Sequence, residues 1–92
     1  MILDLGPAAR DDLERLSEAE RARVFEVIAG IPGAFREPAR HSGIGLRKLH
    51  PRGYWEVRVG LKLRILFRLY PDRAVLLRIA DHNGISRYLR SL

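Results

Sequence analysis

The apolar residues of this chain change their spacing in the middle of the sequence. Up to residue 31 they recur every three to four positions, as on one face of a helix. From residue 54 they alternate with polar residues, as on a half-buried strand. The segment between them, residues 32–45, is rich in Gly and Pro and predicts a loop. The chain is therefore expected to fold as helices followed by an antiparallel sheet, which is the α+β class.

Two helices are predicted in the first half, after a short first strand that residues 1–5 can form. The first helix covers Ala8 to Leu16, following Gly6-Pro7. Ser17 and Glu20 form a capping box that begins the second helix at Glu18. Gly30 and the Pro32-Gly33 pair are expected to end that helix. Its inward face is predicted to consist of Ala22, Phe25, Ile28 and Ala29.

Three antiparallel strands are predicted in the second half, with a fourth if Leu46 to His50 joins them. Asn83 to Leu92 is expected to form a short helix. The prediction is a single domain, residues 1–92, in which two N-terminal helices pack on an antiparallel three- to four-stranded sheet with a short C-terminal helix. The helices are expected on one face of the sheet. Its inward residues are predicted to be Trp55, Val57, Val59, Leu63, Ile65, Phe67, Leu69, Val75, Leu77 and Ile79.

Basic residues are concentrated in the second half. Residues 1–37 carry eight acids and five arginines, whereas residues 38–92 carry three acids and twelve bases, and the chain as a whole is +6. This distribution favours a polyanionic partner, although a solvated basic surface, or the arginine-rich composition that a GC-rich genome gives, would also produce it. The chain has no cysteine, and its three histidines lack the spacing of zinc ligands. No signal peptide or membrane-spanning run is recognisable, so a cytoplasmic location is expected.

The register of the predicted sheet brings two arginines face to face. Pairing Val59 with Leu63 across the Gly60 turn puts Arg58 directly opposite Arg64. Extending the register puts Arg64 opposite Ala80, and it also pairs Leu69 with Val75. Like charges in this position destabilise a sheet unless an anion lies between them, and guanidinium forks match phosphate oxygens. Alternatively, the arginines extend into water or pair with Glu56.

If the last strand continues, His82 joins the same face, with Lys62 and Arg78. Cleavage of RNA by its own 2′-hydroxyl requires a proton acceptor, a proton donor for the 5′-oxygen and stabilisation of the phosphorane charge. A histidine beside arginines can supply the last two, since histidine titrates near neutrality. The alternative is a surface histidine at the start of the last helix. Tyr54, Tyr70 and Tyr88 are candidates for base stacking, whereas Trp55 is predicted to lie in the core.

The segment LRKLHPRGYWEVRVGLKLRILFRLYPDRAVLLRIADHNGISRYL resembles the RelE/ParE superfamily of type II toxin–antitoxin toxins. Its first part, GYWEVRVGLKLRILF, is similar to the YoeB branch, and LLRIADHNGISRYL to the YafQ branch. The resemblance implies a ribosome-dependent endoribonuclease that cleaves mRNA, inhibits translation and needs no metal or cofactor. Glu56 departs from the pattern, since RelE has a lysine there.

The resemblance also implies roles for individual residues. Arg64 falls at the family's phosphate-binding arginine, Arg58 at an active-site lysine, His82 at the catalytic arginine or histidine, and Tyr88 near a catalytic tyrosine. The expected partners are a cognate antitoxin protein, the ribosome and mRNA. His41 is not expected to take part. The residues expected to bind RNA are Arg47, Lys48, His50, Arg52, Lys62 and Arg78.

Two other functions fit the same residues. A ParE-like toxin would inhibit DNA gyrase by binding, without chemistry and without a catalytic His82. A double-stranded RNA-binding module has a related element order. It has one N-terminal helix, however, and a lysine-rich start to its last helix, which this chain lacks.

Overall fold

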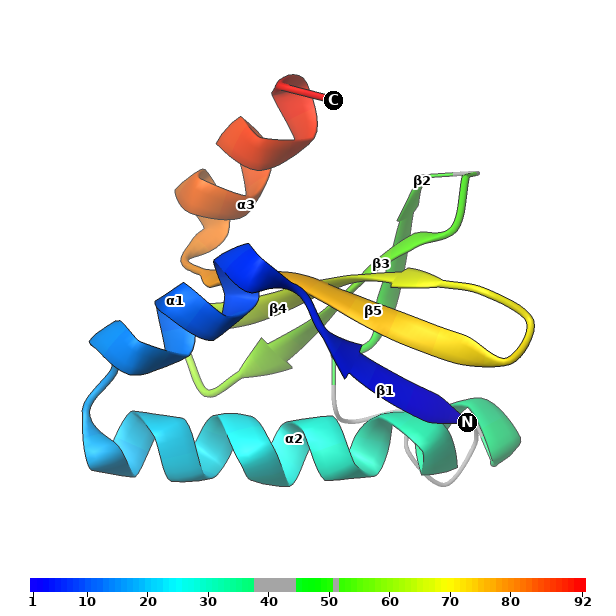
Figure 1. Cartoon of the computed structure of the whole chain (residues 1–92), viewed down its shortest axis with the longest axis horizontal. Coiled ribbons are helices and arrows are strands. Elements are labelled where there is room, and N and C mark those ends of the chain that lie inside the picture. Colours follow the sequence, from blue (N-terminus) through cyan, green and yellow to red (C-terminus); the bar gives the residue numbers. More distant parts are fainter. Residues whose placement is uncertain (38–44, 51) are drawn as a thin grey trace.

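The computed structural model describes residues 1–37, 45–50 and 52–92, with His50 described through its backbone alone. Its five strands lie in the order β1-β5-β4-β3-β2, with β1 parallel to β5 and the other neighbours antiparallel. The sheet is therefore mixed rather than antiparallel, and it has five strands rather than three to four. The chain begins with a short strand within residues 1–5, as expected. The elements are β1 (Ile2–Leu5), α1 (Pro7–Arg15), α2 (Glu18–Arg36), β2 (Arg47–His50), β3 (Tyr54–Val59), β4 (Leu63–Leu69), β5 (Arg73–Ala80) and α3 (His82–Arg90) (Figure 1).

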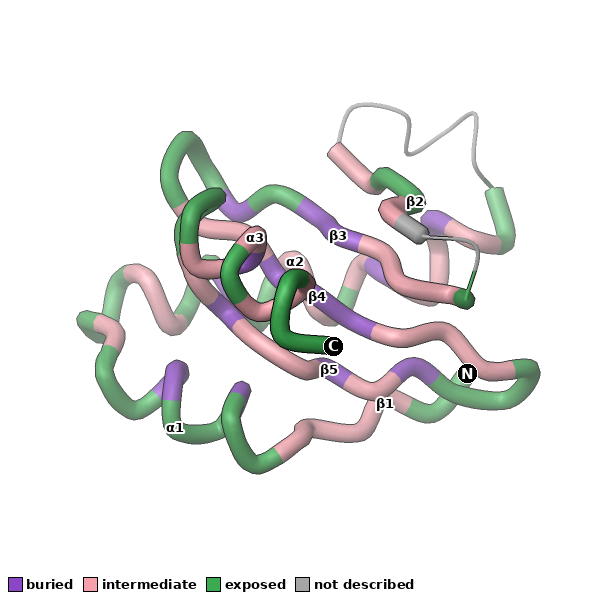
Figure 2. Tube along the Cα trace, turned by 90° about the horizontal axis from the view of Figure 1, so that it is seen from above, coloured by how far each residue is buried: buried purple, intermediate pink, exposed green. Residues whose placement is uncertain are grey.

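The helices lie on both faces of the sheet. Helix α2 runs beneath it, and α3 rises from the end of β5 on the opposite side (Figures 1 and 2). The expectation that all helices share one face is wrong for α3. The main core lies on the α2 face and includes Val57, Ile65 and Phe67. On the other face Leu66 and Ile85 are buried where α3 covers β4 and β5, and this second apolar layer fixes α3 over the sheet.

Helix α2 continues through Pro32 to Arg36 instead of ending at Gly30. A proline in a helix removes one backbone hydrogen bond and costs about 3 kcal/mol. Burial of apolar side chains in the last turns offsets that cost. Ile31 and Ala34 are buried, and the Phe35 ring packs edge-to-face on Trp55 at 5.0 Å between centroids. Tertiary packing therefore overrides the local helix-stop signal.

The inward face of α2 differs from the predicted one. Val24 is fully buried, whereas Phe25 is 52% exposed. Ala22 and Ala29 are also exposed, and Ile28 packs against the core as predicted. The helix is therefore rotated so that its buried row passes through Val24 and Ile31. A short apolar pattern containing several alanines defines the direction of a helix face poorly.

The predicted register holds across β3 and β4. Val59 pairs with Leu63, and Arg58 lies directly opposite Arg64. Arg64 in turn pairs with Ala80 of β5. This arrangement follows from the short turn at Gly60, which has a φ of 64° and therefore suits glycine.

The predicted register fails in the first half of β5. An irregularity between Leu66 and Phe67 shifts the pairing, so that Leu69 pairs with Ala74 and not with Val75. Ala74 and Leu76 consequently face the core in place of Val75 and Leu77. A bulge reverses the alternation along the strand, and the apolar residues on both faces of β5 concealed it in the sequence.

Candidate functional site

A cavity of about 430 Å³ opens on the sheet where β2, β3 and β4 lie side by side. Three arginines and one carboxylate line it, with Gly45 and Leu46 at its edge. Because Arg47 pairs with Glu56, and Arg58 with Arg64, all four charged side chains project from the same face of the sheet. The charged lining residues are Arg47, Glu56, Arg58 and Arg64.

Glu56 organises two of these arginines. Its side chain is 3% exposed, and its Oε1 accepts hydrogen bonds from Arg64 Nη1 and from Arg47 Nη2, the latter at 3.2 Å. A buried carboxylate requires such partners because water no longer solvates it. The alternative raised by the sequence, that Glu56 pairs with the cationic face, is therefore correct for Arg64. The cavity combines cations with one carboxylate and is not purely cationic.

Arg47 and Arg58 are the exposed arginines of the cavity, whereas Arg64 is half-buried. Gly45, at a φ of 76°, lies against Arg58, and a Cβ added to Gly45 would stand 3.0 Å from Arg58 Nε. The glycine thus lets the loop before β2 approach the Arg58 side chain closely. Arg58 and Arg64 both line the cavity, as the predicted register required. Of these two arginines, only Arg64 donates a hydrogen bond to Glu56.

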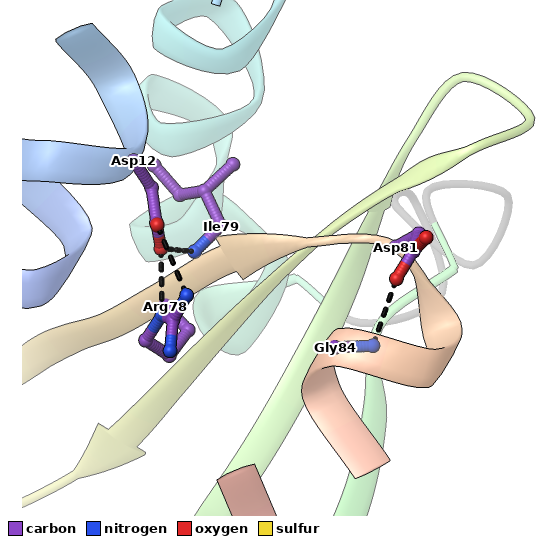
Figure 3. A network of polar contacts seen from close by, with 5 residues as sticks. All are labelled: Asp12, Arg78, Ile79, Asp81 and Gly84. Atoms are coloured by element: carbon purple, nitrogen blue, oxygen red, sulfur yellow. Dashed lines mark hydrogen bonds and ion pairs between the residues drawn. The ribbon is translucent and has the colours of Figure 1, made fainter. Parts of the chain in front are cut away.

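His82 lies at the start of α3, two positions after the partner of Arg64. The expected continuation of β5 is wrong, because the strand ends at Ala80 and Asp81 caps the helix. The Asp81 Oδ1 atom accepts a hydrogen bond from Gly84 N at 2.8 Å (Figure 3). His82 is exposed, and its side chain has no hydrogen bond to another described residue. It stands at the Arg64 end of β5 and has no side-chain hydrogen bond to Arg58 or Arg64.

The strand register places Arg78 on the same face as Arg64, as predicted, but its guanidinium is already bound to a carboxylate. Arg78 Nε and Nη2 donate to the two carboxylate oxygens of Asp12 at 2.8 and 3.1 Å, and Ile79 N donates to Asp12 Oδ2 at 2.8 Å (Figure 3). The hydrogen bond to Asp12 raises the pKa of Arg78 above its ordinary value. This arrangement makes Arg78 a link between α1 and β5, and it leaves less of the guanidinium for RNA than the sequence suggested.

Tyr88 lies over Arg78, with the ring centroid 6.0 Å from the guanidinium carbon. In this position Tyr88 anchors the C-terminal helix to the sheet. No short-range sequence signal indicates Asp12 as the partner of Arg78, because 66 positions separate them. The one clue in the sequence to this pair was that Asp12 lies on the inward side of the predicted first helix.

The other expected RNA-binding residues are dispersed. Lys62 lines a separate cavity with Glu20 and Arg23 of α2, so it does not join Arg58 and Arg64. Arg52 lines a groove with Tyr54 and the end of α3. Lys48 is exposed and pairs with Trp55, which turns it away from the face of Arg47. The side chain of His50 and all of His41 lie outside the described residues.

Within residues 1–37, 45–50 and 52–92, no three His, Asp or Glu side chains gather as metal ligands would. None of the helices in the same ranges is long and apolar enough to span a bilayer.

No protein-family model matches the chain, and no curated protein matches it. Solved structures do. The RelBE2 toxin–antitoxin complex of Mycobacterium tuberculosis matches at 27% identity and a TM-score of 0.65, covering 88% of this chain and 96% of that one. The YoeB/ParE toxin of Agrobacterium tumefaciens matches at 23% identity and a TM-score of 0.66, covering 89% and 99%.

A third similar structure is the RelB–RelE antitoxin–toxin complex of Methanococcus jannaschii, at 17% identity and a TM-score of 0.67, covering 92% of this chain and 96% of that one. These structures belong to one class, the toxins of toxin–antitoxin systems. The 27% identity to the RelBE2 structure, together with the α+β fold, places this chain in the RelE/ParE toxin superfamily. The resemblance carried by residues 46–88 is thereby confirmed.

Proposed function

We propose that this toxin is a ribosome-dependent endoribonuclease that cleaves mRNA and so inhibits translation. The observation that supports it best is the facing pair Arg58 and Arg64 in one cavity with Arg47. Guanidinium groups on directly opposed residues suit a phosphodiester, whose two non-bridging oxygens share one negative charge and accept from planar donors. A carboxylate within the same cavity adds a proton acceptor.

The proposed reaction is transfer of the phosphoryl group from the 5′-oxygen to the 2′-oxygen. Arg58 and Arg64 bind the scissile phosphate and stabilise the charge that develops on it. The Glu56 carboxylate, the one proton acceptor among the described side chains of the cavity, takes the proton of the 2′-hydroxyl. The 2′-oxygen then bonds to phosphorus, the bond to the 5′-oxygen breaks, and His82 protonates the leaving oxygen. The products are a 2′,3′-cyclic phosphate and a 5′-hydroxyl.

Tyr88 orients the substrate or assists proton transfer only if α3 moves relative to Arg78, since its ring now lies against that residue. The proposed mechanism uses no metal ion. The remaining basic residues, Arg47, Lys48, His50, Arg52, Lys62 and Arg78, are proposed to contact ribosomal RNA or mRNA. Such contacts would be made in the cytoplasm, where translation takes place.

The second proposed partner is an antitoxin protein. Several of the similar structures are complexes with RelB or YefM antitoxins. A partner of this kind would cover the basic face of the sheet and block the approach of RNA. Opposite charge on the antitoxin would speed its association, since the chain is +6 overall.

The proposal is tested by following a reporter transcript in translating and non-translating extracts. The chain is supplied as wild type, as Arg64→Gln, and as Arg10→Gln, which alters an exposed arginine of α1 as a matched control. Cleavage is expected in the translating extract with the wild type and the control, and it should be lost with Arg64→Gln. Intact transcripts with the wild type in both extracts would contradict the proposal.

Inhibition of DNA gyrase is the second candidate function. It is favoured by the position of His82, which is exposed and bonded to neither arginine. One similar structure is also described as a YoeB/ParE toxin. Inhibition of gyrase-catalysed supercoiling by a protein that leaves transcripts intact would select this alternative.

A further inference from the structure

A stack of alternating tyrosine and arginine side chains lies at the opposite end of β3 and β4 from the arginine cavity. The Arg68 guanidinium carbon is 5.3 Å from the ring centroids of both Tyr54 and Tyr70, and that of Arg73 is 5.4 Å from Tyr70. These distances are those of cation–π contacts. We call Tyr54, Arg68, Tyr70 and Arg73 the Tyr–Arg ladder.

The ladder shares a sheet face with the arginine cavity. Tyr54 pairs with Arg68, just as Arg58 pairs with Arg64, and the two pairs are an even number of residues apart on each strand. Their side chains therefore project to the same side. At about 3.3 Å per residue, roughly 13 Å of β4 separates Arg64 from Arg68.

A groove of about 270 Å³ adjoins the ladder through Tyr54. It is lined by Leu49, Arg52 and Tyr54 from the sheet side and by Leu89 and Leu92 from the end of the chain. One wall is apolar, and Arg52 adds a cation to the other. The arginine cavity thus offers cations for a sugar–phosphate backbone, and the ladder offers planar groups for bases.

We propose that the Tyr–Arg ladder is a base-stacking subsite for single-stranded RNA, occupied by a nucleotide flanking the one whose phosphate lies at Arg58 and Arg64. Tyrosine rings and guanidinium planes both stack on unpaired bases. The two tyrosines and Arg68 are half-buried, which holds them in place while leaving part of each accessible. The inference rests on the proposed function, because it takes the arginine cavity as the phosphate site.

Charge favours RNA as the occupant of this surface. Residues 38–92 carry twelve bases and three acids. One of the acids, Glu56, is buried against Arg64. Asp4 of β1 lies near the ladder, with Oδ2 at 3.7 Å from Arg73 Nη1, and Asp72 lies in the adjoining turn. Arg68 remains the cation held between the two rings.

The test measures binding of a fluorescein-labelled, single-stranded 2′-O-methyl RNA, which lacks the attacking hydroxyl and so stays intact. Tyr70→Leu is expected to weaken binding by about 5- to 150-fold, the range for losing one stacked base. Tyr70→Phe retains the ring and should bind within about twofold of the wild type. Arg68→Lys keeps the charge but loses the planar group, so it should weaken binding without changing the salt dependence.

A second measurement identifies the base. An oligonucleotide with a single abasic site at each position in turn should weaken wild-type binding at one flanking position. The same abasic site should not weaken binding to Tyr70→Leu any further, because the stacking contact is already missing in that variant.

Two results would overturn the inference. One is wild-type affinity in Tyr70→Leu with a lowered melting temperature, which would make the ladder a support for the turn between β4 and β5. The other is an equal loss of affinity for double-stranded DNA, in which bases are not available for stacking. If Arg64→Gln abolishes cleavage while Tyr70→Leu binds normally, the ladder inference alone is wrong. Intact transcripts with the wild type would overturn the proposed function itself.

Discussion

Arg64 of β4 donates a hydrogen bond to Glu56 of β3, although its direct cross-strand partner is Arg58. The carboxylate lies two positions along β3 from Arg58, on the same face, and is almost completely buried. It therefore offsets the charge of Arg64, which would otherwise repel the facing Arg58. The same contact puts a proton acceptor beside the proposed phosphate site.

Substituting Glu56 should separate binding from cleavage. Glu56→Gln removes a negative charge, so RNA should bind more tightly and the salt dependence should steepen by about 0.7 on a log–log scale. Cleavage should fall by about 10²- to 10⁴-fold, because the proton acceptor is lost. Anisotropy titrations and transcript cleavage, each at several salt concentrations, measure the two effects. Full cleavage by Glu56→Gln would remove Glu56 from the mechanism.

His82 should affect chemistry and not affinity. His82→Ala is expected to slow cleavage by about 10²- to 10⁴-fold, as for the loss of a general acid, with RNA affinity close to that of the wild type. Asn83→Ala, the neighbouring exposed residue of α3, is the matched control. A mutant at His82 that cleaves normally would instead support a binding toxin of the ParE kind.

The ion pair between Asp12 and Arg78 should stabilise the packing of α1 on the sheet. Asp12→Ala leaves the Arg78 guanidinium and Ile79 N without their acceptor, and it should lower the free energy of unfolding by about 3 kcal/mol, the lower end for a broken buried pair. The double variant Asp12→Leu with Arg78→Met should recover part of this loss. Urea denaturation of the wild type, Asp12→Leu, Arg78→Met and the double variant gives the coupling energy. A coupling energy near zero would show that the pair contributes nothing to stability.

Gly45 should control the position of Arg58. In Gly45→Ala the new Cβ would lie 3.0 Å from Arg58 Nε at a φ of 76°, so both the turn and the arginine must shift. We expect a loss of about 1–2 kcal/mol in stability and weaker RNA binding. Gly30→Ala is the control, since its Cβ would meet no atom within 4 Å and alanine favours a helix. Normal RNA binding by Gly45→Ala would mean that Arg58 is not held by this contact.

The capping box of α2 should make stability depend on pH. The backbone hydrogen bond from Ser17 lowers the pKa of Glu20 below its ordinary value of 4.5. A lowered folded-state pKa gives stability that is complete above the unfolded pKa and is lost as pH falls through the folded one. The melting temperature of Glu20→Ala should therefore be lower than that of the wild type at pH 7, and the difference between the two should decrease below about pH 4. The Glu20→Gln variant can keep the hydrogen bond from Ser17 N. Because its amide does not titrate, the contribution of the capping box to its melting temperature should not change with pH.

Features decided by neighbouring residues were predictable. The alternation over residues 54–69 and the short turn at Gly60 defined the hairpin and the facing pair of Arg58 and Arg64. The capping box gave the start of α2 at Glu18. In each case the interacting groups lie within a few positions of one another, so their geometry follows from the backbone period.

Features decided by packing were not predictable. The chain alone did not show that α2 continues past Pro32, because Ile31, Ala34 and Phe35 must first meet the sheet. It did not show that β1 adds in parallel beside β5, nor that a bulge shifts the register in the first half of that strand. Apolar residues on both faces of a strand carry no unique alternation.

The sequence by itself determined the basic second half of the chain, the hairpin and the meeting of Arg58 with Arg64 in this toxin fold. The tertiary structure decided which charges are available there. It directs Arg78 to Asp12, Arg64 to Glu56 and α3 to the face opposite α2. The physical reason is that a charge removed from water must find a partner, and that partner can come from any segment that folding brings within reach.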